Sequence, residues 1–222
     1  MSATAMPKRH GDRPIKGMMA KWYASNTSEM MKDYVELARR VSGEIPAGSR
    51  VLEVAPGPGF FSIELAKLGS YAITGMDLSE TMVELARIKA AEAGVSVSFV
   101  RGSASKMPLQ NSSFDFLLCR AAFKNFAEPV HALREMCRVL RPGGRALIID
   151  LKRNATPKEL SAGVDAMGLT GMNRIVTKLV FRTFLLRSAY TRQQFEAMLA
   201  QTEFSRTEIA EHGIGFEISM TK

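Results

Sequence analysis

The strongest constraint on this chain is a short apolar run that ends in a loop of glycines and prolines, at residues 51–59. Residues 51–54 are apolar except for Glu53 and suit a buried parallel strand. The loop at 55–59 carries no large side chain, and a helical pattern follows at 60–68. A ligand can approach the main chain of such a loop closely, and the next helix offers free N–H groups at its amino end. The passage predicts a strand–loop–helix unit that binds a cofactor.

Two carboxylates near this loop indicate which kind of cofactor it holds. Glu53 would repel a pyrophosphate and attract an ammonium or sulfonium group. Asp77 ends the next apolar run, where a carboxylate can accept both hydroxyls of a ribose. The dinucleotide pattern Gly-x-Gly-x-x-Gly is incomplete, because Ser62 stands at its third position. We therefore expect a ribose-bearing cation without a pyrophosphate, and S-adenosylmethionine has these features.

Further ordered blocks continue this pattern across residues 48–151. The five blocks are Glu-Val-Ala-Pro-Gly-Pro-Gly (53–59), Gly-Met-Asp-Leu-Ser (75–79), Gly-Ser-Ala-Ser-Lys-Met-Pro (102–108), Ser-Phe-Asp-Phe-Leu-Leu-Cys-Arg (113–120) and Arg-Val-Leu-Arg-Pro-Gly-Gly-Arg (138–145). They resemble the class I S-adenosylmethionine-dependent methyltransferases, most closely the small-molecule branch typified by the ubiquinone/menaquinone C-methyltransferases. Two positions depart from the family pattern. Ala55 replaces the usual first glycine, and Ser103 stands where an aspartate usually meets the adenine amino group.

The resemblance implies a set of cofactor-binding residues and S-adenosylhomocysteine as the product. These residues are Glu53, Ala55, Gly57, Gly59, Asp77, Leu78, Ser103, Ala104 and Arg120. The loop would hold the methionine part, Asp77 and Leu78 the ribose, and the pair at 103–104 the adenine. Arg120 would line the floor under the methionine part, with a purely structural arginine as the alternative.

The alternation of strand and helix patterns predicts an α/β fold. We expect strands near 50–54, 71–76, 96–101, 114–119 and 144–150, helices near 59–68, 80–93 and 129–140, and a final hairpin from 203–210 and 214–220. The resemblance implies a Rossmann-like, seven-stranded, mostly parallel sheet with an antiparallel last strand. Residues 1–47 are expected to form a basic tail and amino-terminal lid helices. Residues 48–222 form the core, with a helical insertion at 152–190 that covers the substrate side.

Methyl transfer is an in-line displacement at the sulfonium methyl, so it benefits from a dry, lidded pocket. Tyr23 resembles the tyrosine that many relatives place near the cofactor in their opening helix, and a half-buried aromatic is the alternative. His212, which we place after the sixth strand, is the candidate base on the active-site edge. Asn125 stands in a segment where many relatives carry a histidine, and an asparagine cannot act as a base.

The net charge of +8 leaves several partners open. Arg174, Lys178 and Arg182 recur at helical spacing, either as a solvated face or as a site for an anionic substrate group or lipid headgroups. We expect methylation of a small, apolar or amphipathic metabolite, such as a quinone precursor. The alternatives are an RNA methyltransferase and a non-catalytic S-adenosylmethionine-binding regulator. The Asp/Asn-Pro-Pro-Tyr motif of base methylation is missing, which disfavours nucleic acid.

The sequence also suggests where the protein works. No apolar signal segment opens it and no apolar stretch is long enough to span a membrane, so we expect a cytoplasmic protein. Cys119 and Cys137 are expected to be reduced thiols, and no metal is expected because no metal-ligand cluster is apparent. The expected partner is a small-molecule substrate. Contact with an anionic membrane surface and a homodimer stay open.

Overall fold

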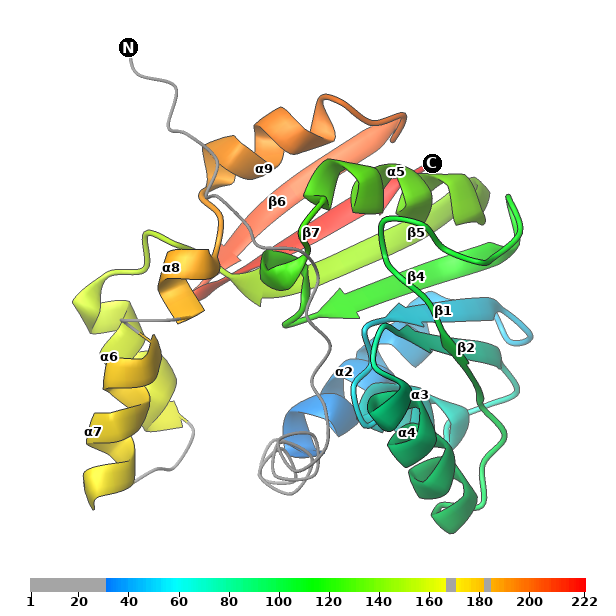
Figure 1. The fold of residues 1–222 in the computed structure, drawn as a ribbon, viewed down its shortest axis with the longest axis horizontal. Coiled ribbons are helices and arrows are strands. Elements are labelled where there is room, and N and C mark those ends of the chain that lie inside the picture. Colours follow the sequence, from blue (N-terminus) through cyan, green and yellow to red (C-terminus); the bar gives the residue numbers. More distant parts are fainter. Residues whose placement is uncertain (1–30, 167–170, 182–184) are drawn as a thin grey trace.

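The computed structural model describes residues 31–166, 171–181 and 185–222 (Figure 1). The strands are β1 (Arg50–Val54), β2 (Ala72–Asp77), β3 (Ser98–Arg101), β4 (Phe114–Arg120), β5 (Leu140–Leu151), β6 (Arg206–His212) and β7 (Gly215–Thr221). The helices are α2 (Met31–Glu44), α3 (Phe60–Ala66), α4 (Glu80–Glu92), α5 (Pro129–Val139), α6 (Pro157–Ala166), α7 (Gly171–Val180), α8 (Leu186–Ser188) and α9 (Arg192–Leu199), with the 3₁₀ turn η2 (Phe123–Asn125).

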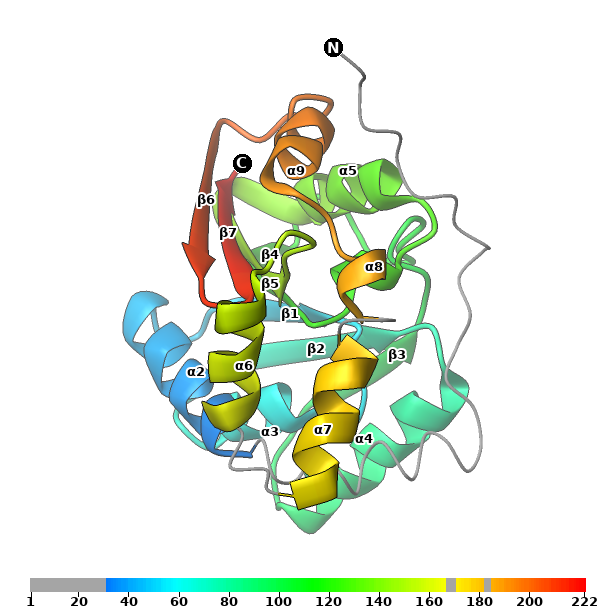
Figure 2. The same ribbon diagram turned by 90° about the vertical axis from the view of Figure 1, so that its left-hand side faces the viewer.

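The described strands form one seven-stranded sheet in the order β3-β2-β1-β4-β5-β7-β6. The pairs from β3 to β5 are parallel, and β7 is antiparallel to both β5 and β6. The chain proceeds outward from β1 in one direction and from β4 in the other. Because parallel crossovers are right-handed, the helices fall on opposite faces, with α2, α3 and α4 on one and α5 and α9 on the other (Figures 1 and 2). The predicted Rossmann-like fold is confirmed.

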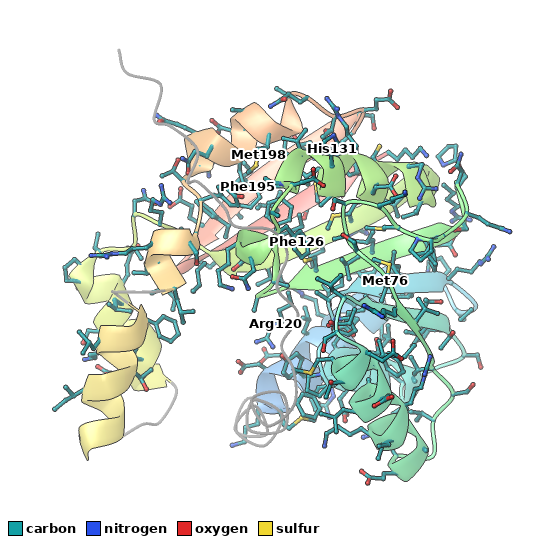
Figure 3. The ribbon with its side chains drawn as sticks, in the orientation of Figure 1. Met76, Arg120, Phe126, His131, Phe195 and Met198 are labelled. Carbon is teal, nitrogen blue, oxygen red and sulfur yellow. The ribbon has the colours of Figure 1, made fainter. Side chains whose placement is uncertain are left out.

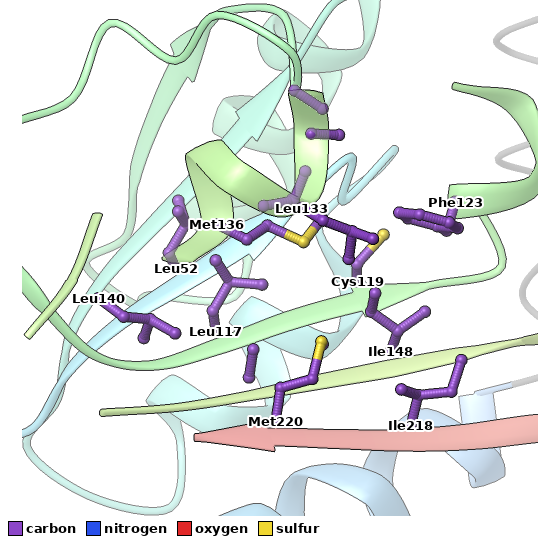
Figure 4. Packing of buried hydrophobic residues seen from close by; sticks show 14 of the residues in the cluster. Leu52, Leu117, Cys119, Phe123, Leu133, Met136, Leu140, Ile148, Ile218 and Met220 are labelled. Atoms are coloured by element: carbon purple, nitrogen blue, oxygen red, sulfur yellow. The ribbon is translucent and has the colours of Figure 1, made fainter. Parts of the chain in front are cut away.

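The two faces of the sheet bury separate apolar cores. Successive strand residues point to opposite faces, so Val51 packs with α2 and α3 whereas Leu52 packs beneath α5 and α9. Leu133 and Met136 on α5 lie against Leu117 of β4 in the second core (Figure 4). These near-continuous apolar strands are typical of a parallel sheet covered on both sides. The resulting rigid sheet fixes the position of every loop at its carboxyl edge.

Some observed bounds differ from those predicted. The fifth strand begins at Leu140 instead of residue 144, because Leu140 pairs with Phe114 before a register shift in β4. The sixth strand begins at Arg206 and continues to His212. His212 is therefore the last residue of a strand, where it pairs with Gly215, and the prediction that it follows the strand was wrong.

The insertion at 152–190 contains α6, α7 and α8 beyond the carboxyl edge of the sheet (Figure 2). Leu160 and Val164 of α6 pack with Leu186 of α8 in a small separate core. In the described ranges, no helix has the length and apolar character that crossing a membrane requires. The role of this insertion as a lid and the division at residue 47 stay predictions. Tyr23 and the basic tail lie outside the described residues.

Gly59 gives the fold a test that is independent of any ligand. A Cβ at Gly59 would lie 2.7 Å from Cζ of Phe99, and the backbone has φ +77°. Gly94 has a similar φ of +67° but open space around the added atom. Gly94→Ala should therefore cost only backbone strain, about 1–2 kcal/mol. Gly59→Ala should cost about 1–3 kcal/mol more, because it adds overpacking.

Urea unfolding of both variants measures these free energies. Equal losses of unfolding free energy in the two variants would contradict the packing of Phe99 against the loop.

Candidate functional site

A cavity of about 800 Å³ lies at the carboxyl edge of the sheet. It sits where the strand order reverses between β1 and β4, which is where open α/β sheets bind their ligands. The residues that line it are Asp33, Tyr34, Glu53, Val54, Ala55, Pro56, Gly57, Pro58, Met76, Asp77, Leu78, Met82, Gly102, Ala104, Arg120, Ala121, Ala122, Lys124, Asn125, Phe126, Ile149, Asp150, Leu151, Phe181, Leu185, His212, Ile214 and Gly215. Figure 3 shows Arg120 at the end of β4. Phe126 directly follows η2.

The chain changes direction at an alanine directly after β1 and again directly after β4, the two strands between which the strand order reverses. Ala55 follows β1 with φ 56°, and its N–H donates to the carbonyl of Met76 at 2.8 Å. Ala121 follows β4 with φ 57°, and its N–H donates to the carbonyl of Ile149 at 2.7 Å. The two segments thus bend towards opposite neighbours and leave space between them. Left-handed backbone at alanine costs about 1–2 kcal/mol, so both sites store strain beside the cavity.

Ala55 accordingly keeps the backbone shape that a glycine would provide at this position. Pro56, Gly57 and Pro58 line the cavity beside it, as predicted for the loop. Gly59 is absent from the cavity wall, and the ring of Phe99 is what requires a glycine there. The sequence identified the loop correctly but could not separate ligand contact from internal packing at this residue.

Glu53 is buried beneath the loop, with its carboxylate held from the next helix. Its Oε2 accepts hydrogen bonds from the Ser62 N–H at 3.1 Å and the Ser62 hydroxyl at 2.6 Å. Burial raises the pKa of Glu53 to about 7, while the bonds from Ser62 and the charge of Arg120 lower it. The serine at the third position of the glycine pattern thus binds a carboxylate instead of packing against a pyrophosphate loop. A cationic ligand here would favour the ionised form of Glu53.

Asp77 connects the loop after β1 with the start of α4. Its Oδ2 accepts from the Gly57 N–H at 3.0 Å, and its Oδ1 accepts from the Ser79 N–H at 2.8 Å. Burial raises the pKa of Asp77, and these backbone hydrogen bonds lower it. The Leu78 N–H donates to this carboxylate as well, so about one of its four acceptor sites stays open for a ligand hydroxyl. Leu78 lines the cavity next to it, so both residues predicted for the ribose reach the same wall.

The predicted adenine pair divides between two roles. Ala104 lines the cavity, together with Gly102. Ser103 is absent from the cavity wall, and its hydroxyl lies 3.0 Å from the hydroxyl of Ser105 and accepts from the Ser105 N–H at 3.3 Å. The side chain of Ser103 therefore stabilises its own turn.

Arg120 borders the cavity and contacts α2, which the sequence did not indicate. Its guanidinium carbon lies 4.2 Å from the ring centroid of Tyr34, and its Nη2 lies 3.3 Å from Oδ2 of Asp33. Both α2 residues line the cavity as well. The sequence predicted helices in this region but not which of their residues reach the cavity.

The far side of the cavity combines an apolar wall with a buried ion pair. Phe126, Ile214 and Leu185 supply apolar surface there. Lys124 Nζ lies 3.1 Å from Oδ1 of Asp150, and the Lys124 N–H donates to Oδ2 of Asp150 at 2.8 Å. Sequence reasoning missed this pair, although a Lys-Asn after the fourth strand and an Asp near the end of the fifth were visible signals.

His212 lines the same part of the cavity, as predicted, from the end of β6. Its role as a base stays a prediction, and so does the role of Tyr23, which lies outside the described residues. Among the described residues, no group of three or more His, Cys, Asp or Glu side chains could hold a metal ion.

Comparisons with known proteins agree with this geometry. Residues 52–148 match a family model described as a methyltransferase domain. The chain is 42% identical over 102 residues to a demethylmenaquinone methyltransferase of Deinococcus radiodurans, covering 46% of this chain and 42% of that protein. It is 36% identical over 105 residues to a ubiquinone/menaquinone biosynthesis C-methyltransferase of Bdellovibrio bacteriovorus, covering 47% and 45%. The chain thus spans about half the length of the curated relatives it matches.

Solved structures show the same fold over nearly the whole chain. A putative S-adenosyl-L-methionine-dependent methyltransferase of Methanococcus maripaludis superposes with a TM-score of 0.77 at 21% identity, covering 96% of this chain and 97% of that one. A SAM-dependent methyltransferase of Aquifex aeolicus gives 0.64 at 22% identity, covering 83% and 88%. The predicted resemblance to class I methyltransferases of the quinone C-methyltransferase branch is confirmed by the sequence matches, and the fold by the structures.

The raised pKa of Glu53 predicts a pH-dependent stability. The folded state resists ionisation between the usual pKa of 4.5 and the raised value of about 7. A destabilising contribution therefore grows over this window and is fully present above pH 7. Glu53→Gln removes it while an amide oxygen can still accept from Ser62. The gain in unfolding free energy should be about 2 kcal/mol larger at pH 8 than at pH 5.

Urea unfolding at the two pH values checks this, with Glu92→Gln on the exposed end of α4 as the control. An equal gain in unfolding free energy at both pH values would contradict the raised pKa of Glu53.

Proposed function

We propose that this chain, in which residues 52–148 match a model of a methyltransferase domain, transfers a methyl group from S-adenosylmethionine to a small, apolar or amphipathic metabolite. The observation that carries the proposal is a single cavity with two unlike ends at the strand-order reversal. One end presents Glu53, Asp77 and open backbone, and the other presents apolar side chains beside the ion pair of Lys124 and Asp150. Its volume of about 800 Å³ lies in the upper part of the usual range for small-molecule sites, about 300–1,000 Å³.

The polar end suits the cofactor. Asp77 keeps acceptor capacity for a ribose hydroxyl, and Glu53 provides negative charge for the ammonium group. The loop of Pro56, Gly57 and Pro58 leaves the main chain open to the ligand. When bound, S-adenosylmethionine supplies an electrophilic methyl group on a sulfonium. A pyrophosphate would meet two carboxylates at this end, which disfavours a dinucleotide.

The other end suits an apolar acceptor. Phe126, Leu151, Phe181, Leu185 and Ile214 surround it, and the insertion contributes two of these residues. The curated relatives of Deinococcus radiodurans and Bdellovibrio bacteriovorus are named for demethylmenaquinone and for ubiquinone and menaquinone biosynthesis. A reduced quinone ring with a free ring carbon has the apolar shape and the electron-rich carbon that this end and this reaction require. We infer such a quinol as the acceptor class.

The reaction needs little covalent chemistry from the protein. The ring carbon donates an electron pair to the methyl carbon, the methyl–sulfur bond breaks, and the ring carbon then releases its proton. The chain holds the two reactants in line and excludes water, which is the main source of rate in such a displacement. His212 lines the acceptor end and is the candidate to accept a proton from the ring or its hydroxyl.

Arg174, Lys178 and Arg182, the basic stripe predicted from their helical spacing, give limited support to a membrane-surface partner. Lys178, the member of the stripe whose side chain the structure describes, donates to the Ser161 hydroxyl at 2.7 Å and lies 3.5 Å from Asp165. It thus pairs with α6, whereas Ile175 and Leu179 of α7 are exposed. Contact with an anionic membrane, a homodimer and a cytoplasmic location remain predictions from the sequence.

Incubation with methyl-labelled S-adenosylmethionine and chemically reduced demethylmenaquinone tests the proposal. We expect label in the quinone product and release of S-adenosylhomocysteine. Asp77→Asn should lower incorporation at subsaturating cofactor by about tenfold, the equivalent of about 1.4 kcal/mol. Asp115→Asn, which alters an acid that pairs with Arg141 outside the cavity, should leave incorporation unchanged.

A parallel incubation with a cell extract covers other acceptors. Label in another small apolar metabolite would replace the quinol but keep the enzyme class. Label confined to RNA, or cofactor binding without any transfer, would contradict the proposed function.

A further inference from the structure

Arg120 is the one arginine that lines the cavity within the described residues. Its side chain is 14% exposed, and the ring of Tyr34 covers one face of the guanidinium. Nη2 faces Asp33 at 3.3 Å. Nη1 is buried and has no hydrogen-bond partner in the described part of the chain. A buried donor without a partner is costly, so Nη1 indicates a missing acceptor at this cavity-lining residue.

The charges around Arg120 indicate the chemistry of that acceptor. Glu53 lies close enough for the positive charge of Arg120 to lower its pKa, and both residues border the same end of the cavity. This end therefore offers one carboxylate and one guanidinium. The methionine part of the cofactor carries one ammonium and one carboxylate. A guanidinium binds a planar carboxylate with two parallel hydrogen bonds, and Nη1 and Nη2 present this geometry.

We propose that Arg120 binds the carboxylate of the cofactor's methionine group and that Asp33 competes with this carboxylate for the same guanidinium. The inference rests on the proposed function, since it assigns a role within the cofactor end of the cavity. Asp33 thereby links the amino-terminal helix α2 to cofactor binding. Tyr34 keeps the guanidinium in place from the same helix in both cases.

The competition should be weak. The side chain of Asp33 is 61% exposed, and such pairs contribute at most about 1 kcal/mol. Removing the aspartate should therefore strengthen cofactor binding by about two- to fivefold. α2 has two other ion pairs to the sheet, Arg40 with Glu217 and Glu44 with Arg145. These lie outside the cavity wall, so they can hold the helix while the pair at Arg120 changes partner.

Calorimetric titration with two ligands tests the proposal directly. S-adenosylmethionine carries the carboxylate, and its decarboxylated form keeps the sulfonium and ammonium but lacks it. The unaltered chain should bind S-adenosylmethionine about tenfold more tightly than the decarboxylated form. In Arg120→Met the two affinities should become nearly equal, through loss of S-adenosylmethionine binding alone. Arg120→Lys keeps the positive charge but cannot form the two parallel hydrogen bonds, so it should give an intermediate ratio of the two affinities.

Asp33→Asn should strengthen binding of S-adenosylmethionine only, and Glu44→Gln is its matched control. Glu44→Gln removes an ion pair between α2 and the sheet away from the cavity, and it should change neither affinity. Thermal unfolding establishes that each variant is folded; if Arg120→Met is not, Arg120→Lys provides the comparison.

An unchanged ligand ratio in the Arg120 variants would overturn the carboxylate assignment, because the guanidinium would then serve another anion or none. Equal changes for both ligands in Asp33→Asn would overturn the competition. These results leave the proposed function standing. Failure of the unaltered chain to bind S-adenosylmethionine would overturn both.

Discussion

The divergence of the chain after β1 and β4 is the constraint on which the site depends. Both strands are central and adjacent, yet Ala55 continues towards β2 and Ala121 towards β5 through main-chain hydrogen bonds. Both residues adopt left-handed backbone at some cost in free energy. Pairing of β1 and β4 with a neighbouring strand on each side offsets this cost. The cavity is the space that this divergence opens. Residues from the ends of β1, β2, β4, β5 and β6 converge on it because the sheet fixes these strands.

The buried carboxylates of the cavity lower the stability of the folded protein, and we interpret them as a means of discriminating between ligands. Burial raises the pKa of both Glu53 and Asp77, so the folded protein maintains two carboxylates in an unfavourable environment. Ser62 and the backbone of Gly57 offset part of that cost by donating hydrogen bonds. Arg120 lies across from Glu53 and completes a site with charges of both signs. Such an arrangement suits a zwitterionic ligand better than a polyanion.

The sequence was sufficient for the fold and for the cofactor end of the cavity, because these depend on local patterns. Apolar runs, small-residue loops and strand-end carboxylates predict β1, β2 and the placement of Glu53 and Asp77 at the cavity without long-range information. Gly59 and Ser103 were placed in the right loops, but only tertiary packing shows that Phe99 and Ser105 are their partners. Arg120 and Asp33 are 87 residues apart in the chain, and Lys124 and Asp150 are 26 apart. The residues themselves can stand out in the sequence, but no local pattern shows that they pair.

The cavity end that holds Glu53 and Asp77 should select a cationic ribonucleoside over a dinucleotide. Titration of the unaltered chain with S-adenosylmethionine and, under the same conditions, with NAD⁺ tests it most directly. Both ligands carry an adenosine, so the comparison isolates the sulfonium amino acid from the pyrophosphate. We expect saturable one-to-one binding of S-adenosylmethionine and at least about a hundredfold weaker binding of NAD⁺, a difference of about 2.7 kcal/mol. Equal affinities, or a preference for NAD⁺, would contradict it.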